Sequence, residues 1–289
     1  MYENKQFSNS LSGSCFQPFL FTFEKSHYFS IMQGLNPRKS LGQHFLTDKN
    51  IARKIVSSMK AEGCESIVEI GPGAGVLTSL LAEKNEITTY FVEIDRDAIH
   101  LLRKTFPWIQ ERLIHGDFLK LDMKNVFKAP VAIIGNLPYN ISSQIFFKIL
   151  DNRNIVKEVV CMVQKEVARR IASPPGNKNY GILSVLLQAF YTIEYLFTVS
   201  PGVFNPPPKV YSGVIRMVRN GTASLACDEE KFFRIVKTSF NQRRKMLRNS
   251  LQNHFVYLHD NDLLLIKRPE QLSVSDFVTL TNRVEYNSE

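Results

Sequence analysis

A glycine-rich turn is the first feature of the chain that could support chemistry. The run Glu69-Ile-Gly71-Pro-Gly73-Ala-Gly75 follows a short apolar segment and precedes a helical pattern. Glycines at these positions allow a tight strand-to-helix turn and let the backbone approach a ligand closely. A dinucleotide-binding turn would need glycine at Val76, and no GK[ST] follows for a triphosphate. The turn therefore predicts a ligand without a pyrophosphate.

Two acidic residues follow the next two predicted strands. Glu93 ends a strand at 88–93, and Asp117 follows a strand at 112–115. A carboxylate at position 93 can accept hydrogen bonds from both hydroxyls of a ribose, and Asp117 is placed to contact an adenine edge. Together with the glycine turn these acids favour S-adenosylmethionine, an adenosine without phosphates. The alternative is a structural turn with solvated acids at strand ends.

A second turn, Asn136-Leu-Pro-Tyr139, follows an apolar strand at 131–135. The exocyclic amine of adenine is a poor nucleophile because its lone pair is delocalised into the ring. Two acceptors, the Asn136 side-chain oxygen and the Pro138 carbonyl, could make that nitrogen pyramidal and reactive, and Tyr139 could stack on the base for about 1–3 kcal/mol. The alternative is a plain Asn-Pro turn beside a half-buried tyrosine.

Strands alternating with helices are the elements that must position these turns. The expected strands lie at 66–70, 88–93, 112–115, 131–134, 156–163 and 210–218, and the expected helices at 51–59, 76–81, 95–102 and 141–150. Such alternation predicts an α/β, doubly wound, Rossmann-like parallel sheet of the methyltransferase type, with ligands at the carboxyl ends of its strands.

Positive charge is concentrated near the C-terminus. The net charge is +9, and residues 231–248 hold seven cations and no acid, so the other 271 residues carry only +2. Apolar residues at helical spacing predict helices at 229–240, 243–253 and 273–281 with a cationic face. Beside a base-modifying site we expect this face to hold an RNA backbone. The alternative is a basic face that contacts only solvent. The candidate RNA-binding residues are Lys237, Arg243, Arg244, Lys245 and Arg248.

These patterns divide the chain into three expected parts. Residues 1–34 have no clear period and are expected to be a poorly ordered extension, with Met32 as an alternative start. Residues 35–220 form the cofactor-binding catalytic domain, and residues 221–289 form a small all-helical RNA-binding domain after Asn220-Gly221.

Cysteine usage and hydropathy exclude several classes. The four cysteines are scattered without a CxxC pair, which argues against a zinc site and a disulfide framework and favours reduced thiols in the cytoplasm. No apolar run reaches the roughly 18 residues of a membrane span. We expect a monomer without a metal or a membrane partner.

The order of five sequence blocks resembles the ribosomal RNA adenine N6-dimethyltransferases. They are Arg38-Lys-Ser-Leu-Gly-Gln-His44-Phe-Leu46, the two turns already described, Phe204-Asn-Pro-Pro-Pro-Lys-Val210 with Ser212, and Phe240-Asn-Gln-Arg-Arg-Lys245. The resemblance covers about residues 36–285. The last block and residues 268–273 favour the branch that modifies small-subunit (16S) RNA, whose loss confers kasugamycin resistance.

This resemblance implies dimethylation of two adjacent adenosines near the 3′ end of 16S RNA in the immature 30S subunit, with a role in its biogenesis. It implies that His44 and Leu46 line the methionine end of the cofactor and that Gly71, within the turn that includes Gly73, lies beneath it. Asn136 would be shared between cofactor and target. Phe204 would sandwich the flipped adenine against Tyr139.

Three alternatives remain open from the sequence. The first is an adenine N6-methyltransferase of large-subunit RNA or DNA. The second is a ribosome-assembly checkpoint factor for which methylation is secondary. A nicotinamide dehydrogenase is the weakest, because Val76 breaks its fingerprint and the Asn136 turn has no role in it.

Overall fold

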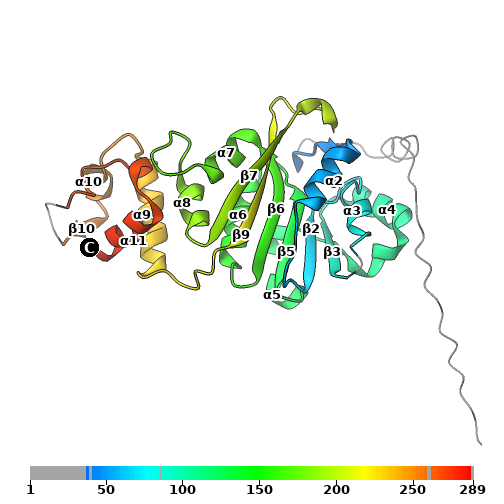
Figure 1. Ribbon diagram of the computed structural model, residues 1–289, viewed down its shortest axis with the longest axis horizontal. Coiled ribbons are helices and arrows are strands. Elements are labelled where there is room, and N and C mark those ends of the chain that lie inside the picture. The colour runs from blue at the N-terminus through cyan, green and yellow to red at the C-terminus, as the bar shows by residue number, and fades with distance from the viewer. Residues whose placement is uncertain (1–36, 39–40, 85, 259–261, 288–289) are drawn as a thin grey trace, which may run out of the picture.

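A seven-stranded sheet with helices on both faces forms the centre of the molecule (Figure 1). The structure is a computed structural model, and it describes residues 37–38, 41–84, 86–258 and 262–287. The expected N-terminal extension at 1–34 lies outside the described residues. The strand order is β4-β3-β2-β5-β6-β9-β7, with bounds β2 Ser66–Ile70, β3 Thr88–Glu93, β4 Leu113–His115, β5 Val131–Asn136, β6 Val156–Gln164, β7 Tyr191–Val199 and β9 Ser212–Arg219.

The sheet is mixed, so the expectation of an all-parallel sheet is wrong for one strand. Strands β4, β3, β2, β5 and β6 are parallel to one another, whereas β9 runs antiparallel to both of its neighbours, β6 and β7. The five parallel strands end at one edge, which brings the glycine turn, Glu93, Asp117 and the Asn136 turn together. Strand β7 and two helices before it were not expected from the sequence.

Alternation along the strands gives the sheet an apolar core on each face. In β5, for example, Ile133 belongs to one buried cluster, and Ala132 and Ile134 belong to the other. The first face is covered by α5 Met123–Val126, α6 Ser142–Asp151, α7 Lys165–Ala172 and α8 Ile182–Gln188, and the second by α2 Lys49–Ser57, α3 Thr78–Leu81 and α4 Arg96–Thr105.

Side-chain caps set the beginnings of several helices. Asp48 accepts hydrogen bonds from two backbone amides of α2, and Asp95 accepts one from Asp97 at the start of α4. In α11 Val274–Asn282, Ser273 and Asp276 form a reciprocal capping box. Short 3₁₀ turns lie at Pro107–Arg112, Phe118–Lys120, Pro201–Val203 and Pro269–Gln271.

The C-terminal part is mainly helical but includes a small sheet. Helices α9 Glu229–Asn241, α10 Leu247–Leu251 and α11 gather at the end of the molecule opposite α4 (Figure 1). Strands β10 Phe255–Tyr257 and β11 Val284–Tyr286 pair antiparallel beside them, so the expectation of an all-helical part is wrong. The helix expected at 243–253 begins only at Leu247, since residues 242–246 form a turn.

One apolar cluster joins the two parts of the chain. Phe232 and Val236 of α9 belong to the same buried cluster as Leu186 and Phe190 of the catalytic part. The expected boundary near residue 220 therefore separates two secondary-structure patterns that share a core.

A short strand pair connects the N-terminal segment to the proline-rich loop. Strand β1 Phe45–Leu46 pairs antiparallel with β8 Phe204–Asn205. This pairing holds residues 41–46 beside the edge where the parallel strands end. We call residues 41–45, which line the cavity described below, the strap.

Gly75 provides a test of the packing of the glycine turn. Its φ is +82°, and a Cβ added there would overlap the Phe106 ring. We expect Gly75→Ala to lose about 1–2 kcal/mol from the left-handed backbone and a further 1–3 kcal/mol or so from overpacking. Guanidinium denaturation measures the loss.

Gly221→Ala is the matched control, because Gly221 has φ +84° and no atom within 4 Å of an added Cβ. It should lose only the backbone contribution. Equal losses for the two variants would show that the contact with Phe106 does not constrain the turn.

Candidate active site

A cavity of about 340 Å³ lies at the carboxyl ends of the parallel strands. Its walls come from the strap, the glycine turn, the ends of β3 and β4, and the segment that begins at Asn136. Eight of the sequence-predicted residues line it: His44, Gly71, Gly73, Glu93, Asp117, Asn136, Pro138 and Tyr139. Residues as far apart in the sequence as His44 and Tyr139 therefore share one site.

The glycine turn forms the floor of the cavity. Gly71 has φ +66°, and no atom lies within 4 Å of a Cβ added there. The space above Gly71 is thus open to a ligand, as the sequence interpretation expects. The neighbouring Gly73 has φ +56° and donates a backbone hydrogen bond of 2.9 Å to Glu93 Oε2.

Glu93 is buried, and backbone donors fix its orientation. Its Oε1 accepts hydrogen bonds from the amides of Ile94 at 2.8 Å and Asp95 at 2.9 Å, in addition to the Gly73 bond on Oε2. Burial raises the pKa of this carboxyl, and the backbone donors partly oppose that shift. The carboxyl group is therefore oriented before a ligand arrives.

Asp117 offers a free acceptor on the same side of the cavity. Its Oδ1 accepts a hydrogen bond from the Leu119 amide at 3.0 Å. Its Oδ2 accepts none from the residues that the structure describes, which leaves it available to a donor such as an adenine amine.

The Asn136 amide is oriented by the strap. Its Nδ2 donates to the backbone carbonyl of His44 at 2.8 Å, so Oδ1 is left as the acceptor. Pro138 O already accepts a weak hydrogen bond from the Ile141 amide at 3.3 Å, whereas Leu137 O accepts none within the described part of the chain. Either carbonyl can serve as the second acceptor expected beside Asn136.

Tyr139 is held at its hydroxyl and faces a histidine. Its hydroxyl is 2.6 Å from Oγ of the buried Ser212. The centre of the His44 ring lies 5.4 Å from that of Tyr139 with an interplanar angle of 31°, and His44 Nδ1 is 2.8 Å from Pro206 O. Burial raises the pKa of Tyr139, which keeps it a neutral phenol.

Phe204 lies outside the cavity, contrary to the expected sandwich with Tyr139. Its side chain is only 4% exposed and packs in the same apolar cluster as Phe45 and Leu46. The reason is its place in β8, because pairing with β1 puts Phe204 opposite Leu46. In this structure the ring beside Tyr139 is that of His44.

A smaller recess of about 30 Å³ adjoins the cavity and contains a buried acid that the sequence interpretation missed. Leu46, Glu69, Gly71 and Asn136 are among its lining residues. Glu69 accepts a 2.7 Å hydrogen bond from Thr78 Oγ1, and burial, with a contribution from Glu93, raises its pKa to about 8. The signal in the sequence was an acid at the end of an apolar strand, directly before the glycine turn.

The five predicted RNA-binding cations differ in their surroundings. Arg243 donates to the Lys178 carbonyl and lies 3.9 Å from Glu270, while Lys237 Nζ lies 5.1 Å from the centre of the Phe147 ring. Arg244, Lys245 and Arg248 have exposed side chains. Among the described residues, no group of three or more His, Cys, Asp or Glu could hold a metal ion.

Comparison with known proteins identifies one family over most of the chain. Residues 34–284 match the profile of a family described as ribosomal RNA adenine dimethylase. The chain is 53% identical over 253 residues to ribosomal RNA small subunit methyltransferase A of Cytophaga hutchinsonii, covering 87% of this chain and 98% of that protein. It is 51% identical over 259 residues to the protein of that name from Bacteroides thetaiotaomicron, covering 88% and 96%.

Two solved structures share the fold. A dimethyladenosine transferase from Plasmodium falciparum aligns with a TM-score of 0.68 at 24% identity, over 82% of this chain and 96% of that one. The 23S rRNA methyltransferase ErmE aligns with a TM-score of 0.60 at 21% identity, over 83% and 100%. The predicted α/β fold class is therefore confirmed.

Glu69 should make stability depend on pH. The unfolded carboxyl titrates near about 4.3, whereas the folded one titrates at about 8. Between these values the folded state keeps a proton that the unfolded chain releases, so stability falls as pH rises. Glu69→Gln removes this contribution, and the difference in unfolding free energy between the two proteins should change by about 1.4 kcal/mol per pH unit in that window.

Urea denaturation of both proteins at a series of pH values measures the difference. Groups that do not interact with Glu69 titrate alike in both proteins and cancel. Parallel pH profiles for wild type and Glu69→Gln would contradict the raised pKa.

Proposed function

The chain belongs to the ribosomal RNA adenine dimethylase family, and we propose that it dimethylates the N6 amines of two adjacent adenosines near the 3′ end of small-subunit (16S) ribosomal RNA. The observation that carries the proposal is the orientation of Asn136, whose Nδ2 is bound by the His44 carbonyl so that Oδ1 is the remaining acceptor. An acceptor held in this way suits an amine that must donate hydrogens while its nitrogen is methylated.

The cavity fits S-adenosylmethionine as methyl donor. Its volume of about 340 Å³ lies within the range of small-molecule sites. Gly71 leaves open space, Glu93 provides fixed carboxylate oxygens for ribose hydroxyls, and Asp117 Oδ2 can accept from the adenine amine. When bound, this cofactor supplies a methyl group that is already activated by its positive sulfur.

The residues of the chain would act by alignment. Asn136 Oδ1 and the carbonyl of Pro138 or Leu137 would accept the two amine hydrogens of the target, and the face of Tyr139 would hold the base by stacking. No side chain needs to form a covalent intermediate, since alignment can account for roughly 7–11 kcal/mol of a barrier. The proton released by the amine would pass to water.

RNA must present the target base outside its stack, which costs a few kcal/mol. The cations of α9, α10 and the turn between them would compensate by holding backbone phosphates. The helices that carry these cations lie at the end of the molecule opposite α4 (Figure 1).

The names of the relatives favour the small subunit over the large subunit. The two relatives described above each share more than half of their aligned residues with this chain, and both are called small-subunit methyltransferases. The substrate that we propose is RNA in the immature 30S subunit, bound by a monomer in the cytoplasm, with a role in subunit biogenesis. Within the described residues, no helix is long and apolar enough to span a membrane.

Asn136→Ala tests the catalytic role. Undermethylated small subunits incubated with labelled S-adenosylmethionine should acquire label on two adjacent adenosines near the 3′ end. The variant should reduce transfer by at least about a hundredfold, as expected when a preorganised transition-state partner is removed, while its affinity for the subunit stays the same. Primer extension maps the modified bases.

The control is Asn125→Ala, an exposed asparagine on α5 that does not line the cavity. It should transfer methyl groups at the wild-type rate. Label on 23S RNA or DNA would refute the proposed substrate. If cells without the protein have a subunit-assembly defect that Asn136→Ala cells do not have, the checkpoint role is favoured.

Arg244 and Lys245 test the RNA-binding face. Changing both to Gln should reduce the slope of log K against log salt by about 1.4, at about 0.7 per phosphate contact for single strands. Filter binding to a 16S RNA fragment at several salt concentrations gives the slope. Arg103 and Lys104, exposed on α4 at the far end, provide the matched double control with the same change of charge. Equal effects of the two double variants would refute the assignment.

A further inference from the structure

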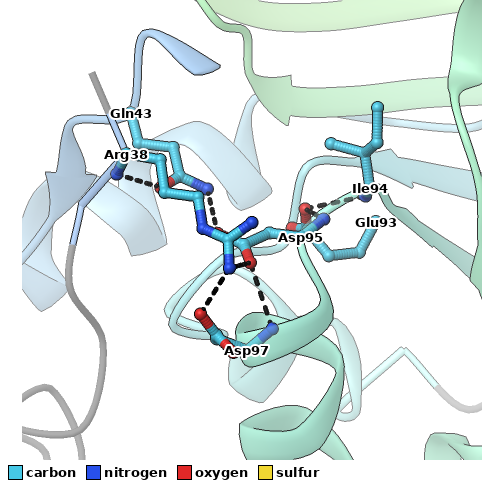
Figure 2. A network of polar contacts seen from close by, with 6 residues as sticks. All are labelled: Arg38, Gln43, Glu93, Ile94, Asp95 and Asp97. Atoms are coloured by element: carbon cyan, nitrogen blue, oxygen red, sulfur yellow. Dashed lines mark hydrogen bonds and ion pairs between the residues drawn. The ribbon is translucent and has the colours of Figure 1, made fainter. Parts of the chain in front are cut away.

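Gln43 has both ends of its side-chain amide engaged. Its Oε1 accepts a hydrogen bond of 2.9 Å from the Arg38 backbone amide, and its Nε2 donates one of 2.8 Å to Asp95 Oδ2 (Figure 2). These two bonds define the amide orientation, because the acceptor end faces a donor and the donor end faces a carboxylate. They tie the strap to the loop at the start of α4.

Asp95 connects this contact to the cofactor side of the cavity. Its side chain is 1% exposed, and its Oδ1 accepts the Asp97 amide at 3.0 Å as the helix cap. Its own backbone amide donates to Glu93 Oε1 at 2.9 Å (Figure 2). The residue that receives Gln43 therefore also orients the carboxylate expected to hold the ribose.

The next residue of the strap connects Gln43 to the target side. His44 directly follows Gln43, and its carbonyl accepts the hydrogen bond from Asn136 Nδ2. A continuous path thus runs from Glu93 through Asp95, Gln43 and the His44 backbone to Asn136. The path joins the cofactor side of the cavity to its target side through the strap.

The neighbouring ion pair between Arg38 and Asp97 is too exposed to hold the strap at the start of α4. Arg38 Nη2 lies 2.7 Å from Asp97 Oδ2, but the two side chains are 47% and 56% exposed. Exposed pairs of this kind contribute about 0–1 kcal/mol. A hydrogen bond to a charged group that is shielded from water is stronger, and an unpaired buried partner is costly. Of these two contacts to the start of α4, the Gln43–Asp95 bond is therefore the one that can hold the strap there.

We propose that Gln43 is a positioning residue that, by binding Asp95, holds the strap over the cavity and so aligns Asn136 with the cofactor-binding carboxylate Glu93. The inference rests on the proposed function, in which Asn136 and Glu93 serve the target and the cofactor. Its consequence is that one contact outside the reacting groups controls both cofactor affinity and the rate of methyl transfer.

Exchange of the donor and the acceptor gives a direct test. In Gln43→Glu two carboxylates face each other, and in Asp95→Asn two amide donors face each other, although asparagine still caps α4. In the double variant Q43E/D95N, the side-chain amide introduced at position 95 can donate to the new carboxylate, the Arg38 amide keeps its acceptor, and the net charge of the pair is unchanged. Asp97→Asn is the matched control, since it removes only the exposed ion pair with Arg38.

Three quantities are measured on the full chain: the Kd for S-adenosylhomocysteine by calorimetry, kcat and KM for transfer to undermethylated subunits, and Tm. Each single variant should weaken binding of S-adenosylhomocysteine by about tenfold and lower kcat by a similar factor. The double variant should return both to within about threefold of wild type, because the two changes are coupled. Asp97→Asn should match wild type.

Additive losses in the double variant would overturn the proposal. So would single variants with a lower Tm whose Kd and kcat per folded molecule equal those of wild type, because the contact would then be structural only. The proposed function fails separately if the wild-type protein binds S-adenosylhomocysteine but does not methylate small-subunit RNA.

Discussion

Burying a carboxyl group without partners is strongly unfavourable, and this constraint organises the edge of the sheet. Glu69, Glu93 and Asp95 are each at most 3% exposed, and all three lie where β2 and β3 end. Each is satisfied by a different donor set: the Thr78 hydroxyl, three backbone amides, and the Gln43 amide with a helix cap. The glycine turn, the start of α4 and the strap are therefore held in place by the acids that they surround.

A fourth buried acid shows what a structural role looks like. Glu158 accepts a hydrogen bond from Arg216 Nε at 2.6 Å and two more from the amides of Lys60 and Ala61. It lines neither the cavity nor the recess, and its partners include a fixed cation. The acids that line the cavity and the recess, Glu69, Glu93 and Asp117, have no cation among their described hydrogen-bond partners, so a cationic ligand would meet uncompensated acceptors there.

Local patterns in the sequence predicted most of the parallel sheet and most of the cavity. The glycine spacing, the acid after each strand and the Asn136 turn are short-range signals, and eight of the residues predicted from them or from the family resemblance line one cavity. The direction of β9 and the position of Phe204 were not predictable in this way, because both depend on pairing between distant strands. Phe204 is turned into the core by Leu46, which precedes it by 158 residues. Strand β7 was not predicted because it lies at an edge of the sheet, where its side chains alternate irregularly between buried and exposed.

The contact between the His44 carbonyl and Asn136 has a consequence for the newly made protein. Ribosomes synthesise the strap before any other part of the site, yet its partner in β8 comes about 160 residues later. A nascent chain that has completed the glycine turn, Glu93 and Asn136 still lacks the strand that anchors the strap beside them. The site can therefore reach its final geometry only after the proline-rich loop has left the ribosome, so an enzyme proposed to modify ribosomes is completed late in its own translation.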